Sequence, residues 1–307
     1  MTRHSRRKIP VAAAAMAAAL ALLASARAQE PSAPDETRSA QEAIRAVDNS
    51  VSVAYAPLHV FYQEPSDGGI PFANYDTEDG TLTDGGQIAV SLMRSFGSWK
   101  DAYVQASLSR ASGSLPYDGT LSLFGGATTI PFDGTSGARI NDWGLRLGKG
   151  VEVGERWLWT PYLSYGYHTW ARSLPAVDLP GIDNAPGFTE IYSHHSLQVG
   201  NRVQYAPVSR VVLTVDGRFG TTLDPEIRSP DIVPNGTFDE RLGAAPVIDL
   251  EAEVDYAVRA PVHLFAGWHY SRYGYGQSGV NAASGLIEPI STTELMTYLI
   301  GARFSFR

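Results

Sequence analysis

Four carboxylates recur at every second residue within residues 248–258. Asp249, Glu251, Glu253 and Asp255 alternate there with apolar residues. Alternate side chains of a β-strand point to opposite faces, so this spacing predicts a strand with one acidic face and one apolar face. A row of carboxylates on one face can line a path for cations, or it can pair with arginines in a buried ion-pair network.

Alternation of apolar and polar residues recurs along most of the chain, with aromatic residues near the ends of the apolar faces. It predicts about ten antiparallel strands joined alternately by short and long connections, an arrangement typical of a membrane barrel. The long connections include a loop that ends near residue 85, a loop over residues 111–137, and a loop containing four prolines at positions 225, 230, 234 and 246. The predicted strands are residues 51–62, 87–96, 102–109, 140–151, 156–172, 190–205, 210–221, 248–258, 262–270 and 295–307.

The beginning of the chain has the pattern of a secretory signal peptide. Basic residues precede an Ala- and Leu-rich stretch, and small residues at positions 26 and 28 complete a cleavage pattern. An uncleaved anchor is the alternative, but the apolar run is short for a spanning helix. The predicted organisation is a signal peptide over residues 1–28, a periplasmic lead-in over residues 29–50 with a short helix at residues 40–47, and a barrel domain over residues 51–307.

The composition restricts the classes of fold and function. No later stretch has the roughly 20 apolar residues of a spanning helix, so a membrane-embedded chain must be a closed barrel. The sequence therefore predicts an all-β fold, a transmembrane antiparallel up-and-down β-barrel. The formal net charge of -8 argues against nucleic acid as a partner. The absence of cysteine excludes disulfides and thiolate metal sites, and we expect no cofactor.

Charged residues on the polar faces of the predicted strands should face the lumen. A barrel of this size is largely filled by its own side chains, and buried charges must be paired. We therefore expect a salt-bridge network that plugs the lumen; an acid-lined pore that selects cations is the alternative. The candidate network residues are Asp142, Arg146, Arg202, Asp216, Arg218, Asp249, Glu251, Glu253, Asp255 and Arg303.

The end of the chain carries the most specific local pattern. Tyr298, Ile300, Phe304 and Phe306 lie on one face of an alternating segment. In this pattern the chain resembles bacterial outer-membrane β-barrel proteins of the small, eight-to-ten-strand kind. The resemblance implies short periplasmic turns, long extracellular loops, and a terminal Phe that the barrel-assembly machinery reads. Arg307 after Phe306 departs from the family pattern by one residue.

Two kinds of hydrolase are the alternatives to a protein without catalytic activity. A resemblance to the omptin surface proteases would imply paired acids and an Asp-His pair near the outer rim. Loop acids are present, but no Asp-x-His stands at the top of a predicted strand. The loop acids are more simply solvated polar residues; they are Asp76, Glu78, Asp79, Asp224 and Glu226.

Histidines offer the second kind of hydrolase, a Ser-His enzyme acting on lipid. His194, His195 and Ser196, or His168, could supply the base and the nucleophile if they lie within hydrogen-bond reach. Alternation sends His194 and Ser196 to the lumen and His195 towards lipid. A metal site shared by His263 and His269 is not expected, because six residues along a strand span about 20 Å.

These observations favour a monomeric outer-membrane protein of a Gram-negative bacterium, porin-like in fold and without enzymatic activity. It would be structural, or would bind an unknown extracellular ligand through its loops. A narrow cation-preferring channel and an outer-membrane hydrolase remain the alternatives. The expected partners are outer-membrane lipid, lipopolysaccharide and, during biogenesis, the assembly machinery.

Overall fold

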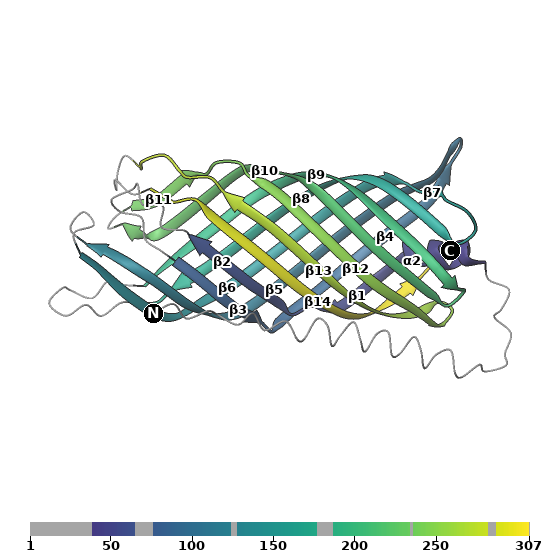
Figure 1. Ribbon diagram of the computed structural model, residues 1–307, viewed down its shortest axis with the longest axis horizontal. Helices are drawn as coiled ribbons and strands as arrows, with labels where there is room; N and C mark the ends of the chain where they lie inside the picture. The colour runs from purple at the N-terminus through teal and green to yellow at the C-terminus, as the bar shows by residue number, and fades with distance from the viewer. Residues whose placement is uncertain are drawn as a thin grey trace, which may run out of the picture.

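The computed structural model describes residues 39–64, 76–123, 128–176, 187–233, 236–281 and 287–306; the predicted signal peptide lies outside them. The described residues form one antiparallel sheet that closes on itself, with a short helix at one end (Figure 1). The elements are α2 (Ala40–Asp48), β1 (Ser50–Tyr55), β2 (Leu58–Glu64), β3 (Asp76–Leu82), β4 (Asp84–Phe96), β5 (Trp99–Leu123), β6 (Thr128–Lys149), β7 (Val151–Glu152), β8 (Trp157–Leu174), β9 (Phe188–Val208), β10 (Val211–Val233), β11 (Gly236–Arg241), β12 (Pro246–Arg259), β13 (Val262–Tyr275) and β14 (Ser291–Ser305).

The sheet is a ring, since β14 pairs with β1 and β1 pairs in turn with β4. The described residues contain fourteen strand segments, somewhat more than the predicted ten. The excess arises because β1 and β2, β3 and β4, β6 and β7, and β11 and β12 each share a neighbouring strand and lie end to end. Each of these four pairs is one interrupted strand, so the chain crosses the barrel ten times.

The connections differ at the two ends of the barrel. Short turns at residues 97–98, 153–156, 209–210 and 260–261 share one end with α2, which we call the turn end. Gly97 and Gly154 supply the left-handed backbone there, with φ of 59° and 83°. The longer connections lie at the opposite end, the loop end, where β11 also lies (Figure 1). The predicted up-and-down barrel with alternating short and long connections is confirmed.

Side chains alternate across the barrel wall as the sequence predicts. Val215, Leu264 and Ile300 point outward and are 54–69% exposed, as expected for a face that contacts lipid. On β12, Leu250 is exposed whereas Asp255 is buried, which confirms the two faces assigned to residues 248–258.

Three predicted loops are wrong in part. Residues 111–123 and 128–137 form paired strands instead, because β5 and β6 remain paired from Ala102 with Lys149 to Leu123 with Thr128. Segment β3 lies within the predicted loop before residue 85, and β10 and β11 occupy much of the proline-containing loop. These segments lie at the loop end and carry few apolar residues on their outer faces, so the alternation there is weak.

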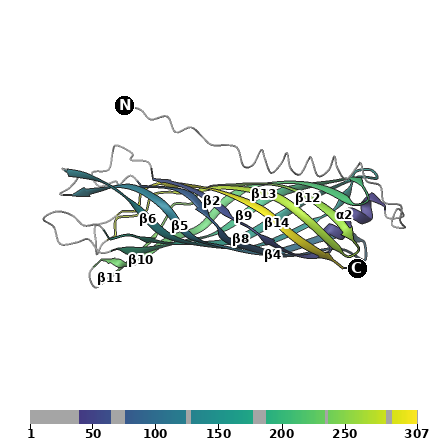
Figure 2. The same ribbon diagram turned by 90° about the horizontal axis from the view of Figure 1, so that it is seen from below.

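Helix α2 lies at the turn end, beside the end of β14 (Figure 2). Ser39 caps its N-terminus in a capping box with Glu42. The helix buries Ala43, Ile44 and Val47 against side chains of the barrel wall. No helix among the described residues is long and apolar enough to cross a membrane.

Candidate functional site

The lumen is the candidate site, and the inward side chains of β8 pass through all of its layers. Leu158 lies at the turn end, Tyr162 and His168 lie further along, and Trp170 and Arg172 lie at the loop end. Each of these side chains belongs to a different cluster of buried residues, and the clusters follow one another from the turn end to the loop end.

The first layer is the cap formed by α2. Ile44 and Val47 pack against an apolar cluster that includes Met93, Tyr103 and Leu158. The buried apolar contact is expected to hold the helix in the barrel opening, since burial of such side chains stabilises by roughly 1.5–3 kcal/mol each. The cap therefore closes the turn end with apolar side chains.

Polar contacts fix the orientation of this cap. Arg45 forms an ion pair with Asp101 at 3.0 Å and a second one with Glu152, both near the short turns. The hydrogen bond to Asp101 is the main reason that the pKa of the Arg45 guanidinium is raised above its usual value. On the inner side, Asp48 forms an ion pair with Arg202 at 3.2 Å. The helix is thus tied to both the rim and the lumen.

The second layer holds the ion pairs next to the cap. Arg303 contacts Asp255 at 2.6 Å and Glu253 at 2.9 Å. His263 lies on the other side of Asp255, with 2.6 Å between Nδ1 and Oδ1. The Arg202 guanidinium donates to the Tyr103 hydroxyl at 2.7 Å.

The third layer crosses the middle of the barrel. Arg146 pairs with Asp216 at 3.4 Å and with Glu251. Arg218 pairs with Glu251 at 2.8 Å and with Asp249 at 3.1 Å. Asp216 also accepts a hydrogen bond from the hydroxyl of Tyr162 on β8.

Tyr162 reaches Asp216 because glycines flank it. Gly148 and Gly200 are its register partners on the neighbouring strands β6 and β9. A Cβ at Gly200 would lie 2.3 Å from the Tyr162 ring, so a larger residue would displace the ring. The Tyr162 hydroxyl donates to Asp216.

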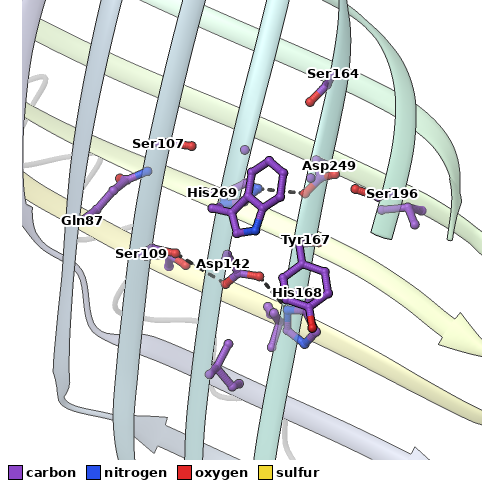
Figure 3. A pocket seen from close by; sticks show the side chains of 18 of the residues that line it. Gln87, Ser107, Ser109, Asp142, Ser164, Tyr167, His168, Ser196, Asp249 and His269 are labelled. Carbon is purple, nitrogen blue, oxygen red and sulfur yellow. Dashed lines mark hydrogen bonds and ion pairs between the residues drawn. The ribbon is translucent and has the colours of Figure 1, made fainter. Parts of the chain in front are cut away.

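The fourth layer contains histidines around a cavity of about 140 Å³ (Figure 3). Asp142 lies 2.6 Å from Nδ1 of His168, and Nε2 of His168 lies 2.7 Å from the Tyr273 hydroxyl. His194 contacts the Tyr275 hydroxyl through Nδ1 at 2.8 Å. A second cavity of about 90 Å³ lies between this layer and the cap.

The fifth layer is an apolar core that the sequence did not indicate. Every one of the ten strand crossings contributes to it, so its side chains come from all around the lumen. Trp170 is fully buried and packs edge to face on Tyr62, with 5.0 Å between ring centroids. The members are Leu58, Val60, Tyr62, Leu82, Ala111, Leu115, Ala138, Ile140, Trp170, Tyr192, Ile227, Phe238, Leu242, Val247, Tyr273, Tyr275 and Leu295.

The outermost layer surrounds Arg172, whose side chain is fully buried. Four carboxylates lie 3.3–3.7 Å from its guanidinium, and the Tyr62 ring lies 4.6 Å from it. The four acidic residues are Glu64, Asp76, Glu78 and Glu190. Two of them, Asp76 and Glu78, are loop acids in the sequence-based interpretation, whereas the structure places them inside the barrel on β3.

Nine of the ten predicted network residues form ion pairs. Eight of these residues pair within the second and third layers, and Arg202 pairs with Asp48 on α2. Asp142 is the exception, since it contacts His168 and Ser109 rather than an arginine. Sequence reasoning missed Asp48, Tyr162 and Arg172. Alternation along residues 156–172 already places Tyr162 and Arg172 on the inward face, so the signal was present for both.

The C-terminal residues take the positions that the predicted alternation requires. Ile300 and Phe304 point outward and are 69% and 55% exposed. Tyr298 shares their face, and its N–H donates to the carbonyl of Pro57 at 3.2 Å. The N–H of Phe306 donates to the carbonyl of Asn49 at 2.9 Å, which holds the end of the chain beside α2.

The residues weighed for catalysis are arranged differently from a Ser-His pair. Both nitrogens of His168 are occupied, by Asp142 and by the Tyr273 hydroxyl. His194 and Ser196 line the cavity, whereas His195 contacts the Tyr165 hydroxyl on the outer face, in agreement with the predicted alternation. In the described part of the chain, no cluster of three or more His, Asp or Glu residues has metal-binding geometry.

No family model and no curated protein matches the chain. Solved structures do match. The outer membrane protease OmpT from Escherichia coli aligns with a TM-score of 0.60 at 8% identity, over 84% of this chain and 95% of that chain. The translocator domain of the autotransporter NalP from Neisseria meningitidis aligns with a TM-score of 0.37 at 12% identity, over 96% and 98% of the two chains.

The chain has the fold of the outer membrane protease, a transmembrane antiparallel up-and-down β-barrel. The turn end is accordingly the periplasmic end and the loop end the extracellular one. At such low identity the likeness shows the fold and no activity. It is consistent with an outer-membrane location.

Proposed function

We propose that the chain is a closed outer-membrane barrel without enzymatic activity, which presents its extracellular loops as a structural or binding surface. The observation that carries this proposal is the apolar core that draws a side chain from every strand crossing. Ions do not pass a dry layer of packed apolar side chains. The cap formed by α2 closes the other end with Ile44 and Val47.

The charged layers between these closures support a plug. An arginine–carboxylate network buried in a lumen stabilises a barrel only while its charges remain paired. The guanidinium groups of Arg146, Arg218 and Arg303 each contact two carboxylates. Export by a cleaved signal peptide, residence in a Gram-negative outer membrane, a monomeric state, and contact with lipopolysaccharide and the assembly machinery belong to the same proposal.

Planar-bilayer conductance of the refolded protein tests this proposal. A shift in gel mobility on heating first establishes that the barrel is folded, and an open porin in the same bilayer establishes that single channels can be recorded. The expected result is a folded barrel without conductance. Steady cation-selective steps would overturn the closed barrel and make the chain a narrow channel.

The channel alternative makes a separate prediction at Glu251, which lines both lumen cavities. Charge reversal at this position should destabilise a plugged barrel, because it places like charges together in the lumen. In an open pore the same change should leave the fold intact and change the ion selectivity.

The Asp142–His168 contact beside the larger lumen cavity supports a hydrolase as a second candidate. A general base held by a carboxylate and facing a cavity is one component of such a site. Turnover of peptide or lipid ester substrates by the refolded protein, lost in His168→Ala and retained in His59→Ala on the outer face, would favour the hydrolase. Absence of turnover in the unsubstituted protein would instead favour the closed barrel without enzymatic activity.

A further inference from the structure

The cluster around Arg172 contains more carboxylates than its one guanidinium can balance. Asp76, Glu190, Glu78 and Glu64 lie 3.3, 3.4, 3.5 and 3.7 Å from it, and all four side chains are at most 12% exposed. Among the described residues, no other Arg or Lys lies within 4.0 Å of them. Burial of several unpaired carboxylates is too costly to persist, so such groups take up protons.

The tyrosines of the cluster are compatible with the same conclusion. The Tyr192 hydroxyl lies 2.6 Å from Glu288, 3.3 Å from Glu190 and 3.4 Å from the Tyr62 hydroxyl, which itself contacts Glu64. The two phenols supply one hydrogen each, which satisfy the bonds to Glu288 and Glu64. A proton on Glu190 would add a donor for its contact with Tyr192, so the arrangement of oxygens accommodates protonated carboxyl groups.

An independent observation concerns Glu78, which is fully buried. Neither of its carboxylate oxygens accepts a well-formed hydrogen bond, and its contact with Arg172 is 3.5 Å long. An ionised carboxylate in this position would lack most of the partners that it needs. A shared proton in the cluster lowers that cost.

Glu288 connects the cluster to the extracellular connection between β13 and β14. Its side chain is buried, although it lies outside the strands. The N–H of Ser278 donates to the Glu288 carbonyl at 3.0 Å, and the N–H of Glu288 donates to the Ser278 hydroxyl at 2.8 Å. The bond from Tyr192 therefore holds both sides of this connection over the barrel.

We propose that the cluster is a proton-operated latch in which protonated carboxylates keep Glu288 buried, and loss of these protons releases Glu288 together with the described residues beside it, 276–281 and 287–290. An ionised Glu288 would face other carboxylates with only one guanidinium nearby. Water is the better environment for that charge. The latch adds a response to external pH to the closed barrel and is independent of whether the lumen conducts.

The groups that face Glu288 determine when the latch opens. Burial, followed by repulsion from Glu190, raises the pKa of Glu288 to about 8. A carboxyl group with that pKa is roughly 1% ionised at pH 6 and roughly 97% ionised at pH 9.5. The titratable groups that face it are Tyr62 and Glu64 on β2, Asp76 on β3, Arg172 on β8, and Glu190 and Tyr192 on β9.

A spin label on the connection can detect its release. The chain has no cysteine, so Val280→Cys, at a position 65% exposed, provides a single labelling site. We expect the label on the refolded protein to be largely immobile at pH 6 and largely mobile at pH 9.5, with a midpoint near the pKa of Glu288. A label whose mobility does not change over this range would overturn the proposal.

Glu288→Gln is the decisive variant, because the amide can donate to Tyr192 but does not ionise in this range. In the Val280→Cys background it should keep the label immobile at both pH values. Glu294→Gln is the matched control; Glu294 pairs with Arg272 at 3.8 Å on the outer surface, and this variant should titrate like the parent. If Glu288→Gln also titrates like the parent, the latch is wrong. The heat-induced gel shift confirms that each variant is folded.

Discussion

Arg146 on β6 and Glu251 on β12 form an ion pair across the lumen, although three strands of the ring lie between them. Two guanidinium nitrogens of Arg146 reach the two carboxylate oxygens of Glu251. Such a two-pronged contact fixes the relative position of both side chains. The pair therefore ties opposite walls of the barrel together.

Removal of one partner of this pair should destabilise the barrel. Glu251→Gln keeps the shape of the side chain but leaves Arg146 and Arg218 with less compensating charge. We expect a loss of about 3–5 kcal/mol in the free energy of unfolding. Urea unfolding of the protein in lipid vesicles, followed by tryptophan fluorescence, measures it.

The matched control is Glu294→Gln at the surface pair with Arg272, where both side chains are at least one-third exposed. This change should cost about 1 kcal/mol or less. The double variant Arg146→Met with Glu251→Gln should lose less than the sum of the single losses, because it removes both charges. Additive losses would show that the two residues are not coupled.

The cap should detach when its apolar contact is reduced. Ile44 is fully buried against the barrel wall, and Ile44→Ala removes contacts whose loss costs about 2–5 kcal/mol in a packed interior. We expect residues 39–49 to become accessible to protease while the heat-induced gel shift is retained. Ile290→Ala, at a position 47% exposed, should leave the cleavage pattern unchanged.

The two closures of the lumen should act independently. Deletion of residues 39–48 should leave the barrel without conductance, because the apolar core at the other end remains. Adding Trp170→Ala and Tyr62→Ala to this deletion removes two of the largest core side chains and should produce ion-conducting steps. Conductance from the deletion alone would show that α2 is the sole barrier.

Most of the barrel wall was predictable from sequence because lipid imposes a strict constraint on it. Outward residues such as Leu250 and Leu264 must be apolar, so the period of two is clear within the membrane. The constraint ends outside the bilayer. The extensions of β5 and β6 carry Gly, Thr and Asp on their outer faces and were therefore predicted as a loop.

The residue types on the inward face of the site were predictable from sequence, but the ion pairs that these residues form with one another were not. Alternation places Arg146 and Glu251 in the lumen, yet their contact depends on the stagger of strands that are distant in sequence. Arg172 shows the limit most clearly. Its inward direction follows from alternation, whereas its partners Asp76 and Glu78 lie on a segment that was predicted as loop.

Stability should fall as pH rises from about 4.5 to above 8, because Glu288 has a raised pKa. Its pKa is about 8 in the folded protein and near the ordinary glutamate value of 4.5 in the unfolded chain. A raised carboxyl pKa contributes stability that is complete below the unfolded value and is lost as pH rises through the folded value. The expected slope is at most about 1.4 kcal/mol per pH unit. Urea unfolding at pH 5, 7 and 9 measures it, and a flat profile would contradict it.

The terminal segment should matter for assembly more than for the stability of the finished barrel. Phe306 follows the last residue of β14, is only partly buried, and is held by a backbone hydrogen bond that does not require its ring. Phe306→Ala should therefore change the free energy of unfolding by about 1 kcal/mol or less.

In cells, the same variant should yield much less heat-modifiable protein in the outer membrane, if the assembly machinery reads this ring. Phe219→Ala, at an outward position 57% exposed on β10, is the control with an equal loss of apolar surface. Equal yields from the two variants in cells would show that Phe306 is not part of an assembly signal.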